Sequence, residues 1–455
     1  MLVSAVGIIL LLCGCSDRIC PVGTVDFVGQ ARLPAASKSA ITGGSHFAHV
    51  IIVVQENRTP DNLFHDPVLI ARGADIATTG LNSLGETISL TPVAMTAQYD
   101  LNHSHVGFLS MYDGGKMDGA DLVSPSCLRK PCVFPPHPQF KYVNPTDVAP
   151  YFQIAEQYTF ADRMFQTNQG PSFPAHQYLL AGTSAPTANS PFYVAENPND
   201  VLRPGVVTGC TAPKDERVRL IGPLGNESSR IYPCFEHSTL PDLLDANEIG
   251  WRYYTSSPGS IWTAPNAILH LSCGPDWTNN ITVNQTLVLK HIAEGGLAAV
   301  TWVIPSGQAS DHADGTDGSG PSWVASIVNA VGNSAYWSNT AILITWDDWG
   351  GWYDHVAPPI INSYEYGFRV PLIVVSQYSK SGYISHVQHD FGSILKFIEN
   401  NFGLPSLGYA DAKADDLSDC FNFNQTPLTF NPIKAQYDAN HFLTDTSPPL
   451  PPDDD

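Results

Sequence analysis

Short apolar runs recur along the middle of the chain, and polar segments separate them. Four runs have the length and β-branched content of buried strands: residues 49–54 (HVIIVV), 298–304 (AAVTWVI), 341–346 (AILITW) and 371–375 (PLIVV). Runs that are apolar on both faces are typical of parallel strands covered by helices on each side. The pattern therefore predicts a largely parallel central sheet.

Helical patterns lie between these runs. The segment TLPDLLDANEIG begins with Thr239 as a candidate N-cap. Residues 321–332 (PSWVASIVNAVG) carry apolar side chains at helical spacing, and HDFGSILKFIENNFG begins with Asp390 as a candidate cap. Strands that alternate with helices predict an α/β fold with a sheet flanked by helices. Residues 67–145 and 185–235 are rich in Gly and Pro, and we expect them to form long cap-like insertions.

The composition limits the classes of partner. The 455 residues are 43% hydrophobic and 14% charged, so the chain can bury a large core. The formal net charge of -21 argues against nucleic acid, which is bound through Lys and Arg, and against electrostatic adsorption to anionic membranes. An anionic substrate remains compatible with this charge because a bound cation can invert the local field.

The two ends of the chain differ from its middle. Residues 1–15 contain an apolar run that fits a signal peptide, and LCGC at their end resembles a bacterial lipobox with lipidation on Cys15. An ordinary secretory signal is the alternative. Either reading predicts export, to the cell envelope as a lipoprotein tethered to the membrane or into the medium. We expect residues 16–45 to be a tether, 46–440 a catalytic domain and 441–455 a disordered Pro/Asp-rich tail.

Export permits disulfide bonds. The short separations favour the pairs Cys127–Cys132 and Cys210–Cys234, although sequence alone leaves the connectivity open.

Polar side chains follow three of the predicted strands. Glu56 and Asn57 come after the first, and Asp347 and Asp348 after the third. Asp311 and His312 similarly follow the strand at residues 298–304. Carboxyl ends of parallel strands meet at one edge of a sheet, where ligands bind. One such pair alone would indicate only a solvated acidic loop. The occurrence of acidic, amide or imidazole side chains after several strands predicts a site for a hard divalent cation.

Ser172 is the candidate nucleophile. In NQGPSFPAHQYLLAG it falls at or just before the start of a predicted helix, where backbone N–H groups favour an anion. A metal-activated hydroxyl at this place could attack phosphorus. The alternative is that Ser172 is only an N-cap, which is a common role for serine.

Histidines supply candidates for proton transfer near neutral pH. His103 and His105 lie in YDLNHSHVGFLSMYDGGKMDGA, which could equally be a surface loop. His355 and His386 could be core or capping histidines.

Taken together, these motifs resemble the phosphoesterase family of bacterial phospholipases C and acid phosphatases, which includes plant non-specific phospholipases C. The resemblance spans nearly all of residues 46–440 and rests on the order of HVIIVVQENRTPDNLFHD, DLNHSHVGFLSMYDGGKMDG, NQGPSFPAHQYLLAG, DHADGTDGSGPSWVASIVNAV, TWDDWGGWYDHVAPP and SHVQHDFGSILKFIENNFG. It implies an alkaline-phosphatase-like α/β fold. It also implies metal-assisted phosphoryl transfer through a covalent phospho-enzyme.

The resemblance assigns roles residue by residue. His103 and His312 would contact the phosphoryl oxygens or the leaving group, with His312 the better candidate for the general acid. Ser172 would be both nucleophile and metal ligand. The other ligands of one divalent metal ion would be Glu56, Asn57, Asp347 and Asp348. This chain departs from the family in having Asp348 in place of glutamate and Trp349 in place of a possible imidazole, which bears on metal preference.

Several functions remain open from the sequence. The substrate could be a phosphate monoester or a phospholipid, or an ester of sulfate or phosphonate on the same fold. A non-enzymatic, metal-stabilised surface binding protein is the alternative of another class. Oxygen ligands favour Ca²⁺, Mg²⁺ or Mn²⁺, and Zn²⁺ remains possible.

Overall fold

The structure is a computed structural model that describes residues 46–128, 130–198, 207–448 and 450. The predictions for the signal peptide, for Cys15 and for the tether lie outside the described residues. In the part of the chain that is described, no helix has both the length and the apolar character needed to cross a bilayer.

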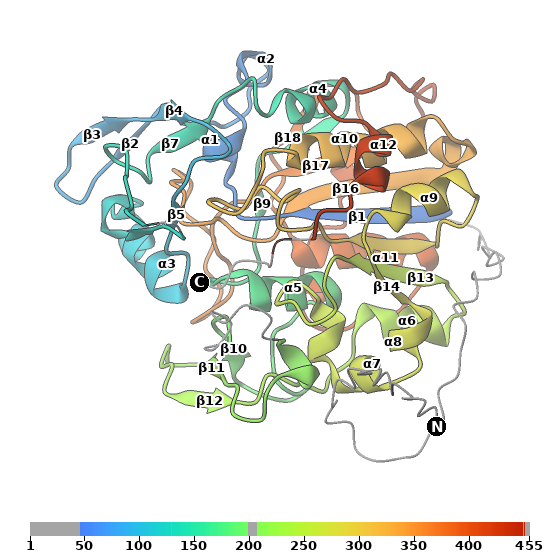
Figure 1. Ribbon diagram of the computed structural model, residues 1–455, viewed down its shortest axis with the longest axis horizontal. Helices are drawn as coiled ribbons and strands as arrows, with labels where there is room; N and C mark the ends of the chain where they lie inside the picture. Colours follow the sequence, from blue (N-terminus) through green and yellow to red (C-terminus); the bar gives the residue numbers. More distant parts are fainter. Residues whose placement is uncertain (1–45, 129, 199–206, 449, 451–455) are drawn as a thin grey trace, which may run out of the picture.

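An eight-stranded sheet runs through the centre of the molecule (Figure 1). Its strand order is β14 (Ile281–Val283), β13 (Trp251–Thr255), β15 (Val300–Val303), β1 (His49–Gln55), β16 (Thr340–Trp346), β17 (Leu372–Val375), β8 (Thr159–Ala161) and β18 (Tyr383–Ser385). β1, β15, β16 and β17 are buried almost throughout. The prediction of a largely parallel sheet is confirmed.

One predicted strand runs the other way. β17 pairs antiparallel with both β16 and β8, while the other pairings in the sheet are parallel. The prediction that residues 371–375 form a parallel strand is therefore wrong in its direction. An apolar run determines that a strand is buried, but its direction depends on the connection before it. Here residues 347–371 connect β16 directly to the adjacent strand β17, without a crossover to the other end of the sheet, so β17 runs antiparallel to β16.

Helices cover both faces of the sheet. In Figure 1, α4 (Ala149–Gln157), α9 (Leu287–Ala293), α10 (Gly320–Gly332) and α12 (Ala439–Thr444) lie on one side, and α5 (Ser172–Ala181), α6 (Leu240–Ala246) and α11 (Phe391–Phe402) lie on the other. The predicted caps are confirmed, since Asp242 accepts from the backbone N–H of Thr239 (2.7 Å) and Asp390 from that of Ser393 (3.1 Å). Shorter helices complete the set: α1 (Pro60–Leu63), α2 (Pro67–Ala71), α7 (Leu269–Cys273) and α8 (Asp276–Asn279).

The folded part of the chain continues beyond residue 440. Phe442 of α12 is buried and packs edge-on against Trp323 of α10, with ring centroids 5.3 Å apart. The prediction that the unpacked tail begins at residue 441 is thus wrong for residues 441–444. A single aromatic residue in a polar segment is a weak sequence signal, but it provides enough apolar surface to attach one helical turn.

The two long insertions lie over one end of the sheet and form the cap. The first contains α3 (His105–Tyr112) and the strands β2 (Thr79–Leu81), β3 (Thr87–Ser89), β4 (Thr91–Val93), β5 (Asp100–Leu101), β6 (Pro125–Ser126) and β7 (Lys141–Val143). The second contains β10 (Tyr193–Val194), β11 (Val218–Ile221) and β12 (Ser229–Ile231). A separate hydrophobic cluster joins the first insertion to Trp349 and Trp352, which follow β16. The cap therefore packs directly on the carboxyl end of β16.

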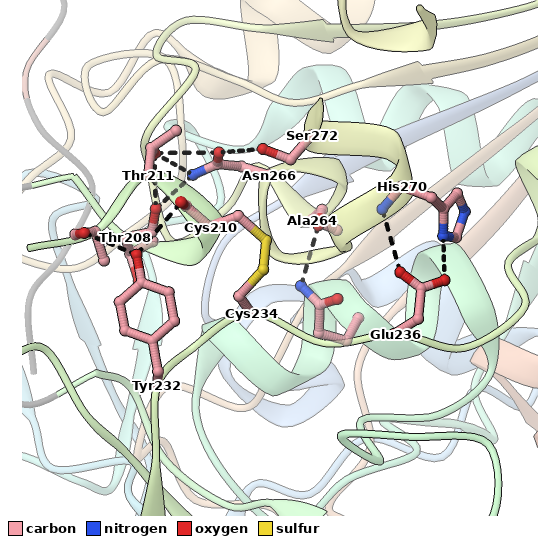
Figure 2. The surroundings of a disulfide bond; sticks show 12 residues. Thr208, Cys210, Thr211, Tyr232, Cys234, Glu236, Ala264, Asn266, His270 and Ser272 are labelled. Atoms are coloured by element: carbon pink, nitrogen blue, oxygen red, sulfur yellow. Dashed lines mark hydrogen bonds and ion pairs between the residues drawn. A yellow bond between two sulfur atoms is a disulfide. The ribbon is translucent and has the colours of Figure 1, made fainter. Parts of the chain in front are cut away.

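Both predicted disulfide bonds are present, and each lies in one of the insertions. Figure 2 shows Cys210–Cys234 beside Asn266, whose side-chain amide donates to the carbonyl oxygen of Thr208 (2.5 Å). The neighbouring carbonyl of Ala264 accepts from Gln177 of α5 (3.4 Å). The disulfide closes a loop within the second insertion, and the hydrogen bond from Asn266 to Thr208 joins that insertion to the segment that supports α5.

Candidate active site

The adjacent strands β1 and β16 end in register. Gln55 pairs with Trp346, so Glu56 and Asn57 lie beside Asp347 and Asp348. The Oδ1 atom of Asp347 accepts from the backbone N–H groups of Asn57 (3.0 Å) and Asp348 (2.7 Å). These two bonds fix the carboxylate of Asp347 across the two strand ends. The structure therefore brings together the four polar residues that follow these two strands.

The chain turns sharply after Asp348. Gly350 has a φ of 62°, and a Cβ there would collide with the carbonyl oxygen of Asn57. Asn57 itself adopts a φ of 61°, a conformation that costs energy for a residue with a side chain. Glycine is therefore required for the two strand ends to approach this closely.

Ser172 is the first residue of α5, and Pro171 occupies the N-cap position. The alternative that Ser172 is an N-cap is wrong, because the Ser172 Oγ donates to Asp348 Oδ2 instead (3.0 Å). The side-chain amides of Gln166 and Asn168 hold the preceding turn by donating to the carbonyl oxygen of Gly170 (3.0 and 2.8 Å). The hydroxyl of Ser172 therefore has a fixed position, buried beside the acidic strand ends.

His176 is a site residue that the sequence analysis missed. It lies one helical turn after Ser172 on α5, and its Nε2 atom is 3.3 Å from Glu56 Oε1 and 3.6 Å from Asp347 Oδ2. Glu56, His176 and Asp347 form a group whose donor atoms are close enough to hold one metal ion. The signal in the sequence was its spacing of four from Ser172, which places both side chains on one face of a helix.

The donor set fits a divalent cation. Several buried oxygen and nitrogen atoms that could bind a metal have no hydrogen-bond partner among the described residues. They are both carboxylate oxygens of Glu56, Oδ1 of Asn57, Oδ2 of Asp347 and both ring nitrogens of His176. Buried polar atoms are nearly always paired in folded proteins, and buried charges require a counter-charge. A cation bound by Glu56, Asn57, His176 and Asp347 would satisfy both requirements. The fit of these residues to a metal is therefore good.

Burial and mutual repulsion shift the pKa values of the carboxylates at the two strand ends. Burial and the neighbouring Asp347 raise the pKa of Glu56 well above its usual value. Burial acts in the same direction on Asp347, but its close contacts with His176 and Glu56 outweigh burial and lower its pKa. Burial and the charge of Asp347 raise the pKa of Asp348 to about 7. A bound dication would favour the ionised form of all three carboxylates.

His103 and His312 lie next to each other at the edge of this group. Their ring centroids are 5.9 Å apart. His103 Nδ1 contacts the carbonyl oxygen of Leu101 (2.8 Å), and its Nε2 lies 3.0 Å from Asn57 Nδ2. His312 Nδ1 contacts the carbonyl oxygen of Ala313 (2.7 Å). All the residues predicted to bind metal or to take part in catalysis therefore converge on one place.

Three other residues singled out in the sequence have different surroundings. Asp311 supports the core, since its Oδ2 accepts from the side chains of Tyr151 and Trp346 (both 2.8 Å). His105 lies under the cap with its Nδ1 2.5 Å from Glu227. His386 is paired with Asp162 (2.9 Å).

His355 belongs to a second acidic group. Its ring contacts Asp61 (2.7 Å) and Asp75 (3.0 Å), and the spacing of Asp61, Asp354 and His355 would also suit a metal. Here the guanidinium of Arg369 already supplies a positive charge, with contacts of 3.2 Å to Asp61 and 2.9 Å to Asp354. We therefore interpret this group as a structural ion network.

This network makes a testable contribution to stability. Burial alone would lower the pKa of His355, but its hydrogen bond to Asp61 and that residue's charge raise it to about 9. A raised pKa stabilises the folded state at low pH, and this stabilisation is lost as the pH rises from about 6.5 through 9. His355→Gln should therefore lower the free energy of unfolding more at about pH 6 than at about pH 9.5 in urea titrations. Equal losses at both pH values would contradict this account.

Comparisons with known proteins identify the family of the chain. The model of the Phosphoesterase family matches residues 47–405. The chain is 26% identical to the non-hemolytic phospholipase C of Pseudomonas aeruginosa over 66% of its length and 46% of the relative. It is 24% identical to phospholipase C B of Mycobacterium tuberculosis over 89% of its length and 82% of the relative. A solved protein of the alkaline phosphatase superfamily from Vibrio parahaemolyticus aligns over 89% of this chain and 78% of its own, with a TM-score of only 0.37 and 12% identity.

The chain therefore belongs to the Phosphoesterase family, as the motifs in the sequence predicted. This membership and the phospholipase C relatives support a hydrolase acting on phosphoric ester bonds. The chain spans about half the length of the Pseudomonas relative and most of the Mycobacterium relative.

Proposed function

We propose that this protein is an exported, metal-dependent phosphoric ester hydrolase of the phospholipase C type, with Ser172 as its nucleophile. The observation that carries the proposal is the position of the Ser172 hydroxyl. It lies at the start of a buried helix, 3.0 Å from Asp348 and on the same helix face as His176 of the candidate metal group. A hydroxyl beside a helix N-terminus and a cation site suits attack on an anionic phosphoryl group.

The side chains have distinct tasks in this proposal. Asp348 accepts the hydrogen bond of Ser172, orients its oxygen for in-line attack on phosphorus and takes its proton as the Oγ–P bond forms. The backbone N–H groups at the start of α5 favour the charge of the phosphoryl group. His103 holds a phosphoryl oxygen, and His312 gives a proton to the departing alcohol. Water then hydrolyses phospho-Ser172 and regenerates the hydroxyl.

One divalent cation, when bound, would polarise the phosphoryl oxygens and lower the pKa of the serine hydroxyl. Its ligands would come from Glu56, Asn57, Ser172, Asp347 and Asp348, to which the geometry adds His176. Like charges at the ends of β1 and β16 are then compensated by the ion rather than by protons.

The cap supports a lipid rather than a small soluble substrate. Large apolar side chains from three distant segments are exposed here: Val106 (62% exposed) and Leu109 (50%) on α3, Leu224 (94%) between β11 and β12, and Ile360 (37%) after β16. Three of these, all but Val106, line a pocket of about 420 Å³ together with His105 and Gln169. Gln169 lies three residues before Ser172 in the sequence, so the segment that leads to the nucleophile forms part of the pocket wall. Exposed apolar groups at a site entrance suit acyl chains.

The charge of this surface favours uncharged or zwitterionic lipids. None of the described residues that line the pocket is a Lys, Arg, Asp or Glu. With a net charge of -21 the protein would also be repelled by an anionic bilayer. We therefore propose a zwitterionic phospholipid as the substrate, with a phosphate monoester as the alternative.

A panel of substrates tests this proposal. The purified protein would be assayed with phosphatidylcholine, p-nitrophenylphosphorylcholine and p-nitrophenyl phosphate, each with and without a chelator. We expect chelator-sensitive hydrolysis of both choline diesters. Hydrolysis of the monoester alone would assign the protein as an acid phosphatase, and activity only on sulfate or phosphonate esters would assign another hydrolase. No turnover of any ester, with intact metal binding, would favour a binding protein.

Export is also a proposal. It is supported by the sequence of residues 1–15 and by two disulfide bonds, which persist mainly in oxidising compartments. A lipid on Cys15 would keep the enzyme at the cell envelope. Retention of the full chain in the cytoplasm with its cysteines reduced would contradict this localisation.

A further inference from the structure

We propose that His176 Nε2 is a direct ligand of the divalent ion, and that this nitrogen makes the site select Zn²⁺ or a similar late first-row ion over Ca²⁺ and Mg²⁺. This inference rests on the metal site of the proposed function. It goes beyond the oxygen ligands expected from the motifs, because it adds an imidazole nitrogen, one helical turn after Ser172 on α5.

The distances suit ligands of a common ion. His176 Nε2 lies 3.3 Å from Glu56 Oε1 and 3.6 Å from Asp347 Oδ2. Two donors held tetrahedrally at about 2.0–2.2 Å from a zinc ion are separated by about 3.3–3.6 Å. Good N–H···O hydrogen bonds have donor–acceptor distances of about 2.7–3.2 Å. The spacing is therefore that of neighbouring ligands rather than of hydrogen-bonded partners.

The main alternative is a protonated His176 that acts as the counter-charge itself. An imidazolium has two N–H donors, and both would need acceptors in this buried place. Neither ring nitrogen of His176 has a hydrogen-bond partner among the described residues, although its side chain is only 1% exposed. Two unsatisfied charged donors would be costly. A neutral ring with its Nε2 lone pair on a cation leaves a single N–H unpaired.

The surroundings of His176 hold the ring in place. Every residue of α5 is buried, and the helix contacts α6 and α11. The next residue, Gln177, donates to the carbonyl oxygen of Ala264 beside the Cys210–Cys234 disulfide (3.4 Å; Figure 2). Glu56 and Asp347 lie at the ends of two central strands. A site built from such rigid elements discriminates ions by ligand type and geometry.

The donor set decides the selectivity. Ca²⁺ and Mg²⁺ are hard ions that prefer oxygen ligands only, whereas imidazole suits Zn²⁺ and Fe²⁺. Glu56, Asp347 and His176 give two carboxylates and one imidazole nitrogen, a mixed set of oxygen and nitrogen donors that Zn²⁺ accepts.

The test measures ion binding to the metal-free protein by calorimetry, comparing wild type, His176→Gln and His49→Gln. His49 is a matched control because it is a partly buried histidine at the opposite end of β1. We expect His176→Gln to lose at least about 100-fold in Zn²⁺ affinity and to change little in Ca²⁺ or Mg²⁺ affinity, since even outer-shell changes cost about 10–100-fold. The control should bind Zn²⁺ as wild type does.

Pulsed EPR of the wild-type protein loaded with one equivalent of Cu²⁺ gives a readout that does not depend on a variant folding. Modulation from the remote nitrogen of a coordinated imidazole is expected. Unchanged Zn²⁺ affinity in folded His176→Gln, or no imidazole signal from wild type, would overturn the inference while leaving the proposed function intact. If wild type binds no divalent ion at all, the metal site of the proposed function fails as well.

Discussion

Ser172→Ala is expected to lower kcat by at least about 10⁴-fold on any ester that the protein hydrolyses. The Ser172 hydroxyl is the atom that would form the bond to phosphorus, and no other side chain in the site can replace it at the start of α5. Because alanine is accepted in the first turn of a helix and leaves the metal ligands from the strand ends in place, folding and ion binding should persist. Steady-state kinetics on a diester and a monoester measure the effect.

Ser184→Ala is a matched control for this experiment. Ser184 is also a buried serine, but its hydroxyl donates to the carbonyl oxygen of Val194, away from the carboxylates. This variant should retain turnover within about tenfold of wild type. If Ser172→Ala were as active as Ser184→Ala, Ser172 would not be the nucleophile.

Asp347→Asn is expected to have the second largest effect. The variant keeps an oxygen that can accept from Asn57 and Asp348, so the turn is preserved. It removes one negative charge from the group formed with Glu56 and His176. We expect turnover to fall by roughly 10³-fold, which corresponds to several kcal/mol of lost charge stabilisation.

The same variant should lose the response of its melting temperature to divalent ions. An ion that binds only the folded state raises the melting temperature, and weaker binding reduces this shift. Asp121→Asn serves as the control, because Asp121 lies on the surface of the cap and accepts from Ser83. An Asp347→Asn protein that is stabilised by the ion as strongly as Asp121→Asn would show that Asp347 is not a ligand.

The central strands and their ends could be predicted from the sequence. Uninterrupted apolar runs identify β1 and β16, and the polar pairs that follow them must meet if the two strands are parallel neighbours. The direction of β17 could not be predicted, because an apolar run is the same in either direction. β8 and β18 contain only three residues each, which is too short for a periodic pattern.

The metal group was predicted only in part. His176 is surrounded by Pro, Ala, Tyr and Leu in the sequence, so it has the pattern of a core histidine, and only the fold brings it to Glu56. Trp349 was expected to bear on the metal. Its side chain instead packs against Phe368 in the cap cluster, with ring centroids 4.8 Å apart. Such tertiary contacts depend on how the cap folds over β16, which local sequence does not encode.

The central claim is that phosphoryl transfer proceeds through Ser172. The most direct test is to quench the enzyme rapidly with denaturant at neutral pH, which preserves acid-labile phosphohistidine, during turnover of its best ester and to analyse the peptides by mass spectrometry. We predict one adduct on the peptide that contains Ser172, a phosphocholine group from a choline diester or a phosphoryl group from a monoester, absent in Ser172→Ala. Turnover with no protein adduct, or with the phosphoryl group on a histidine such as His103, would contradict the account.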